Sequence, residues 1–296
     1  MSNSILFIIN PISGNGKGKL IEPEILTYFK NKNRAIKIIF AEYAGHAKQI
    51  ALDELANHHD AIIACGGDGT INEVAQSLVN TSTPLGILPI GSGNGLASNL
   101  HIPKDISKAL AVIEEQFVLQ MDVGKLNDQY FFSNVGIGMD AQVIHRYAEE
   151  KKRNFSGYMK ATIWSFLNYK SKAITLETEE QKLSTDQYFF ALISNSNEAG
   201  YGISFTPYAK WNDGKLDLLL VKKLNLFELL QFGICVITKK IDQMKKSITL
   251  QPKWIKIKSE EKSFKAQIDG EAVFIDSNVI EVSILPKALR ILVPKQ

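Results

Sequence analysis

The chain has 296 residues, of which 45% are apolar, which is enough for a large core and fits two soluble domains. Its 34 Lys and Arg against 31 Asp and Glu give a formal net charge of +3, too balanced for the basic stripe that nucleic-acid binding requires. Two distant cysteines, Cys65 and Cys235, exclude a disulfide framework. With no segment typical of a signal peptide or a membrane span, a soluble cytoplasmic protein is expected.

The first 120 residues alternate between two kinds of segment. Segments 4–10, 35–42, 61–65 and 84–90 are short, β-branched and apolar throughout, which is typical of strands in a sheet covered on both faces. Segments compatible with helices lie at 20–31, 46–57, 70–79 and 105–115. This alternation predicts βαβ units and a parallel sheet.

From about Val118 the pattern changes. Strand-like segments, several with period-2 alternation, are separated by Gly, Asn, Asp or Pro, and helical patterns remain only at 141–169 and 224–241. A run of strands after a βα region predicts a second, mostly antiparallel domain.

Three glycine-rich turns follow three of the predicted strands: NPISGNGKG from Asn10, GGDGT from Gly66 and GSGNGLA from Gly91. In an open parallel sheet ligands bind beyond the carboxyl ends of the strands, where glycine backbone and helix N-termini favour phosphate. Three purely structural turns are the alternative. Because all three fall on one edge of the sheet, we favour a phosphate-bearing ligand. Neither the Walker A nor the dinucleotide spacing is present.

The second turn contains an aspartate that a structural interpretation of the sequence does not explain. Thr70 is suited to cap the helix that follows, with Glu73 as its capping-box partner. Asp68, in contrast, places an anion among amides that would bind phosphate. We therefore predict that Asp68 holds Mg²⁺ through water, acts as a base, or does both.

The three turns, in this order, resemble those of the diacylglycerol kinase catalytic domain family, which includes bacterial lipid kinases, sphingosine kinases and ceramide kinases. The resemblance continues through MDVG (121–124), SNVGIGMDAQV (133–143), NDGKLDLLLV (212–221) and IDGE (268–271), and so covers essentially the whole chain. It implies an α/β N-terminal domain with a parallel sheet like that of phosphofructokinase and NAD kinase, over 1–123 and completed by 288–296. It also implies a mostly antiparallel β-sandwich C-terminal domain over 124–287 that receives the lipid.

The resemblance further implies ATP and Mg²⁺ as cofactors and Glu271 of IDGE as the proton acceptor. If Asp269 and Glu271 lie on a strand, both face one side of it, whereas a DG hairpin turn is the alternative. We favour Glu271 as the base and Asp68 in the metal–water network. The family's nucleotide-contacting threonine corresponds to Ala41 here, so that contact is missing or supplied by another group. The residues expected to bind the nucleotide are Asn10, Ser13, Gly14, Gly16, Lys17, Gly67, Asp68, Gly69, Thr70, Ile71, Asn72, Glu73 and Ser92.

The second half of the chain carries further expected site residues. A structural Mg²⁺ held by the Asp213 side chain and the carbonyls of Lys210 and Lys215 is implied by the resemblance, whereas NDG alone is simply a good hairpin turn. Asp122 and Asp140 match acidic positions that line the family's cleft, with Asp140 near a polar lipid headgroup. A strand-end turn is an equal alternative for both.

A lipid acceptor requires a membrane surface. Segment 154–169 carries Tyr158, Phe166 and other apolar residues next to the basic cluster 151–153, which suits the interface of an anionic membrane. An amphipathic helix packed on the sandwich is the favoured alternative.

The sequence thus predicts an ATP-dependent lipid kinase acting on diacylglycerol to give phosphatidic acid, at a peripheral membrane surface and without nucleic acid. The alternatives are a sphingoid-base kinase, which Gly95 in the third turn favours, a ceramide kinase, an NAD kinase, and a lipid-binding regulator without turnover. The oligomeric state is open, with a homodimer among the alternatives.

Overall fold

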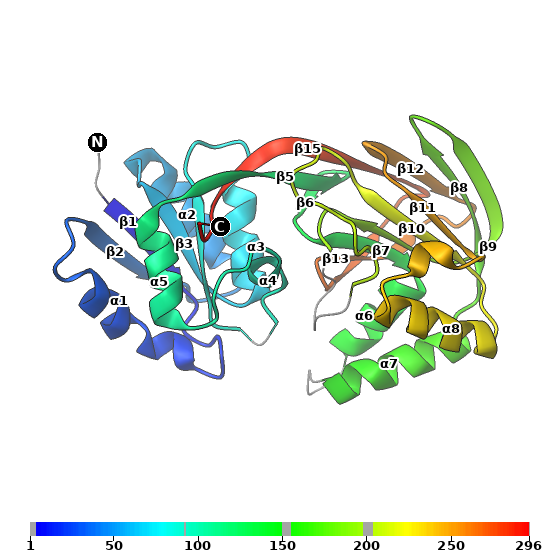
Figure 1. Ribbon diagram of the computed structural model, residues 1–296, viewed down its shortest axis with the longest axis horizontal. Coiled ribbons are helices and arrows are strands. Elements are labelled where there is room, and N and C mark those ends of the chain that lie inside the picture. Colours follow the sequence, from blue (N-terminus) through cyan, green and yellow to red (C-terminus); the bar gives the residue numbers. More distant parts are fainter. Residues whose placement is uncertain (1–3, 92, 150–154, 198–203, 296) are drawn as a thin grey trace. The chain divides into compact units, whose positions relative to one another are not determined.

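The computed structural model describes all residues except 1–3, 92, 150–154, 198–203 and 296. The chain folds into two compact units. Unit 1 consists of residues 1–123 and 286–296, and unit 2 of residues 124–285. Figure 1 shows the helices and strands of both units.

The sheet of unit 1 is built on four parallel strands in the order β4-β3-β1-β2. β3 is buried along its whole length and β1 from Ile5 onward, because helices cover both faces of the sheet. The parallel sheet predicted from the continuous apolar segments is confirmed. The strands are β1 (Ser4–Ile9), β2 (Ala35–Phe40), β3 (Ala61–Gly66) and β4 (Leu85–Pro89).

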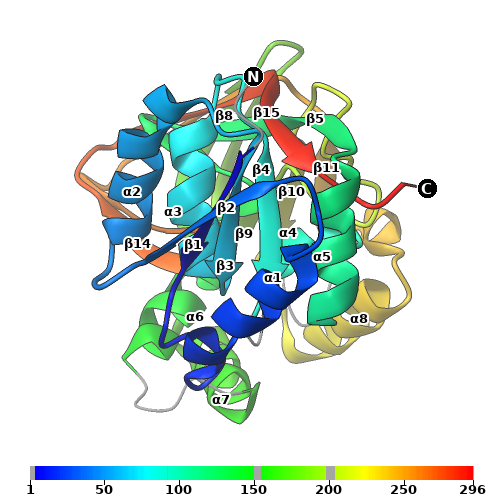
Figure 2. The same cartoon turned by 90° about the vertical axis from the view of Figure 1, so that its left-hand side faces the viewer.

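The helices of unit 1 form two layers around this sheet. α1 (Glu22–Phe29) contacts α5 (Ile106–Glu115) on one face, and α2 (His46–Glu54) contacts α3 (Asp68–Leu78) on the other, as Figure 2 shows. The short α4 (Gly95–Asn99) follows β4, and the 3₁₀ turns η1 (Lys17–Leu20) and η2 (Leu55–Asn57) flank α1 and α2. The four predicted helices are present, but α3 begins two residues before Thr70.

The sheet of unit 1 is completed by residues from the far end of the chain. β15 (Val279–Leu292) begins in unit 2 and ends in unit 1, where Ile291 pairs in parallel with Leu85 of β4. Leu289, Ile291 and Leu292 are buried in the core of unit 1. The last strand therefore completes the sheet of the first domain, as expected from the sequence.

All strand pairs with a described register within unit 2 are antiparallel. In β12 the side chains alternate strictly, so that Ile255 and Ile257 point into the core while Lys256 and Lys258 point outward. The antiparallel second domain is confirmed. β5 (Val118–Leu126) begins in unit 1 and ends in unit 2. The other strands of unit 2 are β6 (Gln129–Phe131), β7 (Asn134–Gly138), β8 (Lys172–Thr178), β9 (Lys182–Ser194), β10 (Asp217–Lys222), β11 (Ser247–Leu250), β12 (Trp254–Ser259), β13 (Phe264–Ile268) and β14 (Glu271–Ile275), with the first part of β15.

The helices α6 (Met139–Ala148), α7 (Phe155–Asn168) and α8 (Leu226–Ile237) pack with the 3₁₀ turn η3 (Ile241–Gln243) on one side of β9 and β10. Two residues of α7 that the sequence assigns to a membrane-facing surface are packed inside unit 2. Tyr158 packs edge-on against Tyr147, and Phe166 packs edge-on against Phe189. These two aromatic residues belong to the packed face of the helix. The basic cluster 151–153 lies outside the described residues. Among the described residues, no helix is long and apolar enough to span a bilayer.

Candidate functional site

The three glycine turns meet at one edge of the parallel sheet of unit 1. The register aligns Ile9 of β1 with Cys65 of β3, and Gly66 of β3 with Pro89 of β4, so that the three strands end side by side. Backbone hydrogen bonds then join each turn to its neighbour: Asn10 N–H donates to Cys65 O at 2.9 Å, and Ile90 N–H donates to Gly66 O at 2.9 Å. The convergence expected from the sequence is therefore present.

Glycine is required where these turns touch. Gly14 has a φ of +61°, and a Cβ there would lie 2.6 Å from the carbonyl oxygen of Ile90. A Cβ on Gly91 would lie 2.5 Å from the Cα of Gly67. Asn10 links the first two turns, because its Nδ2 donates to Thr70 Oγ1 at 3.0 Å. Ser13, Gly14 and Gly16 remain partly exposed and Lys17 is exposed, whereas Ser92 lies outside the described residues.

Asp68 has a structural role that the sequence did not indicate. Its carboxylate accepts the N–H of Asn94 at 2.9 Å and the N–H of Gly95 at 2.7 Å, at the start of α4. The two oxygens thereby fix the third turn to the second. The expectation that structure alone leaves Asp68 unexplained is wrong, because the partners of the carboxylate lie in another loop. Each oxygen keeps a further acceptor lone pair, so a contact with a metal-bound water stays a prediction.

The predicted capping box is also wrong. α3 begins at Asp68, with Gly67 as its N-cap and no side-chain cap, so Thr70 and Glu73 lie inside the helix. Thr70 is buried, and Ile71 has a fully buried side chain. The Glu73 carboxylate instead accepts the N–H groups of Gly45 at 2.8 Å and Ala47 at 3.1 Å, and so caps α2. Of this group, Gly69 and Asn72 are partly exposed.

In unit 2 the IDGE motif forms a hairpin turn. Asp269 and Gly270 join β13 to β14 with φ values of +49° and +84°, and Ile268 pairs with Glu271 across the hairpin. The strand interpretation, with Asp269 and Glu271 on one side, is therefore wrong and the turn alternative is right. The Asp269 carboxylate accepts three backbone N–H groups, while Glu271 is exposed at the start of β14.

Two motifs that the sequence presented separately are joined by these hydrogen bonds. The N–H groups that donate to Asp269 belong to Phe132, Ser133 and Asn134, at distances of 2.8 to 3.0 Å, and β13 pairs with β7 directly beside them. SNVGIGMDAQV and IDGE therefore form one structural site within unit 2. The sequence contains both motifs, but no pattern in it indicates that they are in contact, because more than 120 residues separate them.

Gln267 is a residue of this site that sequence reasoning missed. Its Nε2 donates to Asn134 Oδ1 at 2.7 Å and to Asp140 Oδ2 at 3.0 Å, and its Oε1 accepts the N–H of Gly270 at 2.8 Å. Asp140 lies in the first turn of α6, partly buried. Burial raises the pKa of Asp140 to about 6, against the smaller opposite effect of the Gln267 hydrogen bond. This carboxyl can therefore change its proton near neutral pH.

Asp122 does not lie at a strand end. It is buried within β5, and its Oδ1 accepts the N–H of Lys287 at 2.7 Å, at a residue of β15 with a φ of +57°. The turn alternative is wrong for this residue. The observed contact fixes the backbone of β15 in unit 1.

The predicted second metal position lies in the loop before β10. Asp213 is exposed, and its Oδ1 accepts the N–H of Lys215 at 3.1 Å across Gly214, which has a φ of +73°. The loop is thus a side-chain-closed turn, which needs no metal, while the exposed carboxylate is accessible to one. In the part of the chain that the structure describes, no three His, Cys, Asp or Glu side chains form a metal-binding group. The site of Lys210, Asp213 and Lys215 stays a prediction.

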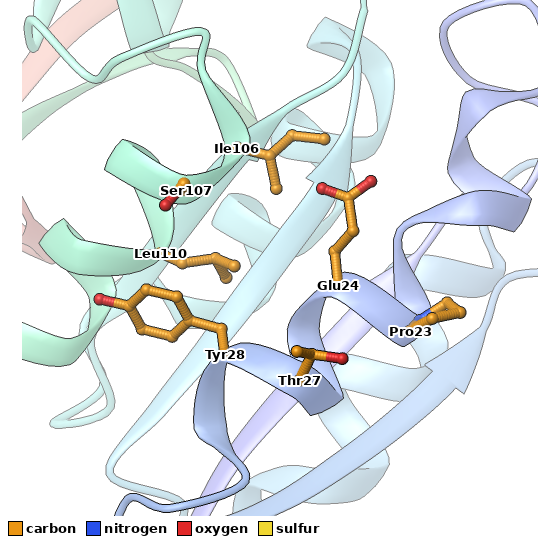
Figure 3. A pocket seen from close by; sticks show the side chains of 7 residues that line it. All are labelled: Pro23, Glu24, Thr27, Tyr28, Ile106, Ser107 and Leu110. Atoms are coloured by element: carbon orange, nitrogen blue, oxygen red, sulfur yellow. The ribbon is translucent and has the colours of Figure 1, made fainter.

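A groove of about 360 Å³ lies between α1 and α5 of unit 1, as Figure 3 shows. At its side the Tyr28 hydroxyl donates to Glu114 Oε2 at 2.8 Å, and burial together with this carboxylate raises the pKa of Tyr28 to about 12. None of the predicted site residues lines the groove. Its lining residues are Pro23, Glu24, Thr27, Tyr28, Ile106, Ser107 and Leu110.

Comparison with known proteins identifies both halves of the chain. The diacylglycerol kinase catalytic domain matches residues 4–126, and the YegS C-terminal NAD kinase beta sandwich-like domain matches residues 133–293. A diacylglycerol kinase of Staphylococcus saprophyticus is 31% identical over 227 residues, which cover 75% of this chain and 74% of that protein. The chain belongs to the diacylglycerol kinase family. A Staphylococcus aureus diacylglycerol kinase is also 31% identical, over 75% of this chain and 71% of its own. This member of the family is accordingly an enzyme of the lipid kinase class.

Solved structures support the fold assigned to this family member. A diacylglycerol kinase of Bacillus anthracis has a TM-score of 0.73 at 21% identity, covering 99% of this chain and 97% of its own. Another structure from that organism reaches a TM-score of 0.82 at 22% identity, covering 99% and 95%. Yeast NADH kinase, solved with NADH, has a TM-score of 0.57 at 13% identity, covering 99% and 84%. The likeness to NAD-kinase-type folds expected from the sequence is confirmed, and at these identities it concerns the fold alone.

Proposed function

We propose that the protein transfers the γ-phosphate of ATP to the hydroxyl group of a membrane lipid, with diacylglycerol as the acceptor and phosphatidic acid as the product. The observation that carries the proposal is the convergence of three glycine turns on one sheet edge, in a member of the diacylglycerol kinase family. Close-packed glycine backbone at the carboxyl ends of parallel strands suits a chain of phosphates.

In this proposal the nucleotide binds across the three glycine turns. Lys17 is exposed in the first turn and would supply a cation for the phosphates, and Asp68 keeps the third turn in place through the N–H groups of Asn94 and Gly95. Mg²⁺, when bound with the nucleotide, neutralises phosphate charge during transfer. Within this chain, the Asp68 carboxylate fits a contact to metal-bound water, because each of its oxygens accepts only one backbone N–H.

Glu271 is the proposed base for the acceptor hydroxyl. Its side chain is exposed at the end of the hairpin whose turn is fixed by Asp269, so the carboxylate is accessible while the backbone beneath it is held. Asp140 is the proposed contact for the polar headgroup, because it is partly buried in the same structural site and has a pKa of about 6. Glu271 accepts the proton of the acceptor hydroxyl as the hydroxyl oxygen bonds to the γ-phosphorus and the bond from that phosphorus to its bridging oxygen breaks, which releases ADP.

The acceptor is tested by incubating the protein with labelled ATP, Mg²⁺ and, separately, diacylglycerol, sphingosine, ceramide and NAD. We expect labelled phosphatidic acid to be the main product. Labelled sphingosine phosphate, ceramide phosphate or NADP as the main product would replace diacylglycerol with that acceptor, and no labelled product with any acceptor would favour a regulator without turnover.

The residues are tested with substitutions that spare the structure. Glu271→Gln keeps the size of the side chain and is expected to lower kcat by roughly 10²–10⁴-fold. Glu281→Gln is the matched control, because Glu281 is exposed in β15 and pairs with Lys256 at the surface. Asp68→Asn keeps one acceptor for Gly95, so a fall in kcat with an unchanged melting temperature supports a chemical role. A fall in both kcat and the melting temperature would indicate that Asp68 acts only by holding the turns together.

A further inference from the structure

α8 in unit 2 is apolar on two faces. On its inner face Leu229, Phe232 and Val236 pack on the helix-covered side of β9 and β10, where Phe232 lies edge-on to Phe190. This spacing of three and then four residues is that of a helix packed on a core. In Figure 1 α8 (gold) lies on the same side of the strands of unit 2 as α6 and α7.

The opposite face of α8 is also apolar and is left exposed. Ile237 is 83% exposed and Phe227 is 77% exposed. Intervals of four, four and three residues place Leu226, Leu230, Ile234 and Ile237 in one row along the helix, and Phe227 lies next to Leu226. We call this row the α8 outer stripe; it consists of Leu226, Phe227, Leu230, Ile234 and Ile237. A contiguous exposed apolar row on a folded domain indicates a surface that is covered by something else.

The surroundings of the α8 outer stripe are cationic. Residues 222–246 contain six lysines and two acidic residues, a net charge of +4. One of the acids, Glu228, is already used: it closes the capping box with Asn225 and forms an ion pair with Lys246. Lys222 and Lys223 lie just before the helix and Lys239 and Lys240 just after it, all exposed and, within the described residues, outside any ion pair.

This charge pattern decides between two occupants. A second copy of the chain, paired through a twofold axis, would bring the two cationic borders together, and like charges across an interface disfavour association. An anionic bilayer offers apolar acyl chains to the stripe and negative headgroups to the lysines at both ends. We propose that the α8 outer stripe and its flanking lysines dock the protein on the surface of an anionic lipid bilayer.

α7 extends this surface. It packs into the same core as α8, through Ala161, yet leaves Ile163, Trp164 and Leu167 exposed on its outer side. The guanidinium of Arg146 lies 4.0 Å from the centre of the Trp164 ring, which adds a cation beside a residue suited to the headgroup level. Both helices therefore present apolar residues bordered by cations from the helix-covered side of unit 2.

The geometry corresponds to a helix lying in the interface. α8 has 12 residues, whereas a bilayer span needs about 20. Its inner face is fixed to the core of unit 2, so the outer stripe is held as a rigid patch. The docking proposal rests on the proposed function only for its purpose, which is to bring the kinase to a lipid acceptor; binding to the bilayer itself needs neither ATP nor diacylglycerol.

The test is co-sedimentation of the full chain with vesicles that contain no diacylglycerol, in the absence of nucleotide. One vesicle is phosphatidylcholine alone and the other is an equimolar mixture of phosphatidylcholine and phosphatidylglycerol. Phe227→Ser with Ile237→Ser is expected to lower partitioning onto the anionic vesicle by at least roughly tenfold. Lys239→Gln with Lys240→Gln is expected to lower it by roughly fivefold or more, and less at high salt. Phe274→Ser is the matched control, an exposed phenylalanine of unit 2 in β14, and is expected to bind as the parent does.

A second measurement separates docking from catalysis and from folding. With a short-chain, water-dispersed diacylglycerol, the Phe227→Ser, Ile237→Ser variant should keep the parent's turnover, while turnover on vesicle-bound diacylglycerol falls. The proposal is overturned if the parent chain fails to bind anionic vesicles, if the α8 variant binds as well as the control, or if the parent is a dimer that the α8 variant dissociates. Vesicle binding without kinase activity would sustain the docking surface and refute the proposed function.

Discussion

Removing the carboxylate of Asp269 should destabilise unit 2 by several kcal/mol. This side chain accepts Phe132 N–H on Oδ2 at 2.9 Å, and Ser133 and Asn134 N–H on Oδ1 at 2.8 and 3.0 Å. Hydrogen bonds to a charged acceptor contribute about 1.5–3 kcal/mol each, so three set an upper limit of roughly 5–9 kcal/mol. Asp269 is only half-buried, so water replaces part of this, and we expect about 3–4 kcal/mol for complete removal.

Two substitutions separate the carboxylate from the turn. Asp269 has a φ of +49°, which alanine tolerates poorly, whereas glycine and asparagine accept it. Asp269→Gly removes both acceptor oxygens, and so all three hydrogen bonds, without strain in the turn. Asp269→Asn keeps the oxygen that serves Ser133 and Asn134 but turns an NH₂ group towards the Phe132 N–H, so a smaller loss of about 2 kcal/mol is expected.

Urea unfolding followed by tryptophan fluorescence reports on unit 2, because Trp164, Trp211 and Trp254 all lie within residues 124–285. Asp276→Asn, an exposed aspartate after β14, is the control and should change the free energy of unfolding by less than about 0.5 kcal/mol. If Asp269→Gly were no more destabilising than this control, the three hydrogen bonds would contribute nothing and the reasoning would be refuted.

Two predictions concern pH. Burial opposes ionisation of Glu54, but hydrogen bonds from Lys37, His59 and Asn57 outweigh it and lower the pKa to about 2 from 4.5. Because the folded-state pKa is depressed, up to about 2 kcal/mol of stability, after allowance for screening by water, is present above pH 4.5 and is lost as the pH falls towards 2. Hydrogen exchange of β3 amides should show this loss between about pH 5 and pH 2, and Glu54→Gln should abolish the dependence; an unchanged profile would contradict it. Asp140 has the opposite sign: its folded-state pKa is raised from 3.8 to about 6, so its contribution favours folding below 3.8 and is lost as the pH rises through 6. Asp140→Asn is therefore expected to stabilise unit 2 at about pH 8 by up to about 3 kcal/mol, with no gain at about pH 3.5, as read by tryptophan fluorescence.

The architecture of both units could be predicted because it depends on local patterns. β1 and β3 are apolar throughout and buried on both faces, whereas β12 alternates and has one buried face. The glycine turns could be placed on one edge because parallel strands joined by helices end on the same side. These inferences need only periodicity and connectivity.

The contacts of the acidic site residues could not be predicted in the same way. Asp68 bonds to amides 26 and 27 residues away, and Asp269 to amides 135 to 137 residues away. No short-range pattern indicates such partners, so the sequence predicts a chemical role for Asp68 and does not reveal its structural one. The prediction for Glu73 is wrong for a related reason: S/T-x-x-E is a local signature of a helix start, but α3 begins at Asp68, and the Glu73 carboxylate accepts an N–H group at the start of another helix, α2.

β15 gives the chain an unusual order of assembly. The first 123 residues leave the ribosome before unit 2, yet Leu289, Ile291 and Leu292, which close the side of β4, are translated after it. During synthesis, the edge of the sheet at β4 therefore stays unpaired until unit 2 has been translated. A chain truncated just before Ala288 would retain every glycine turn and still lack the strand segment that pairs with β4, so we expect its unit 1 to fold less stably than that of the full chain.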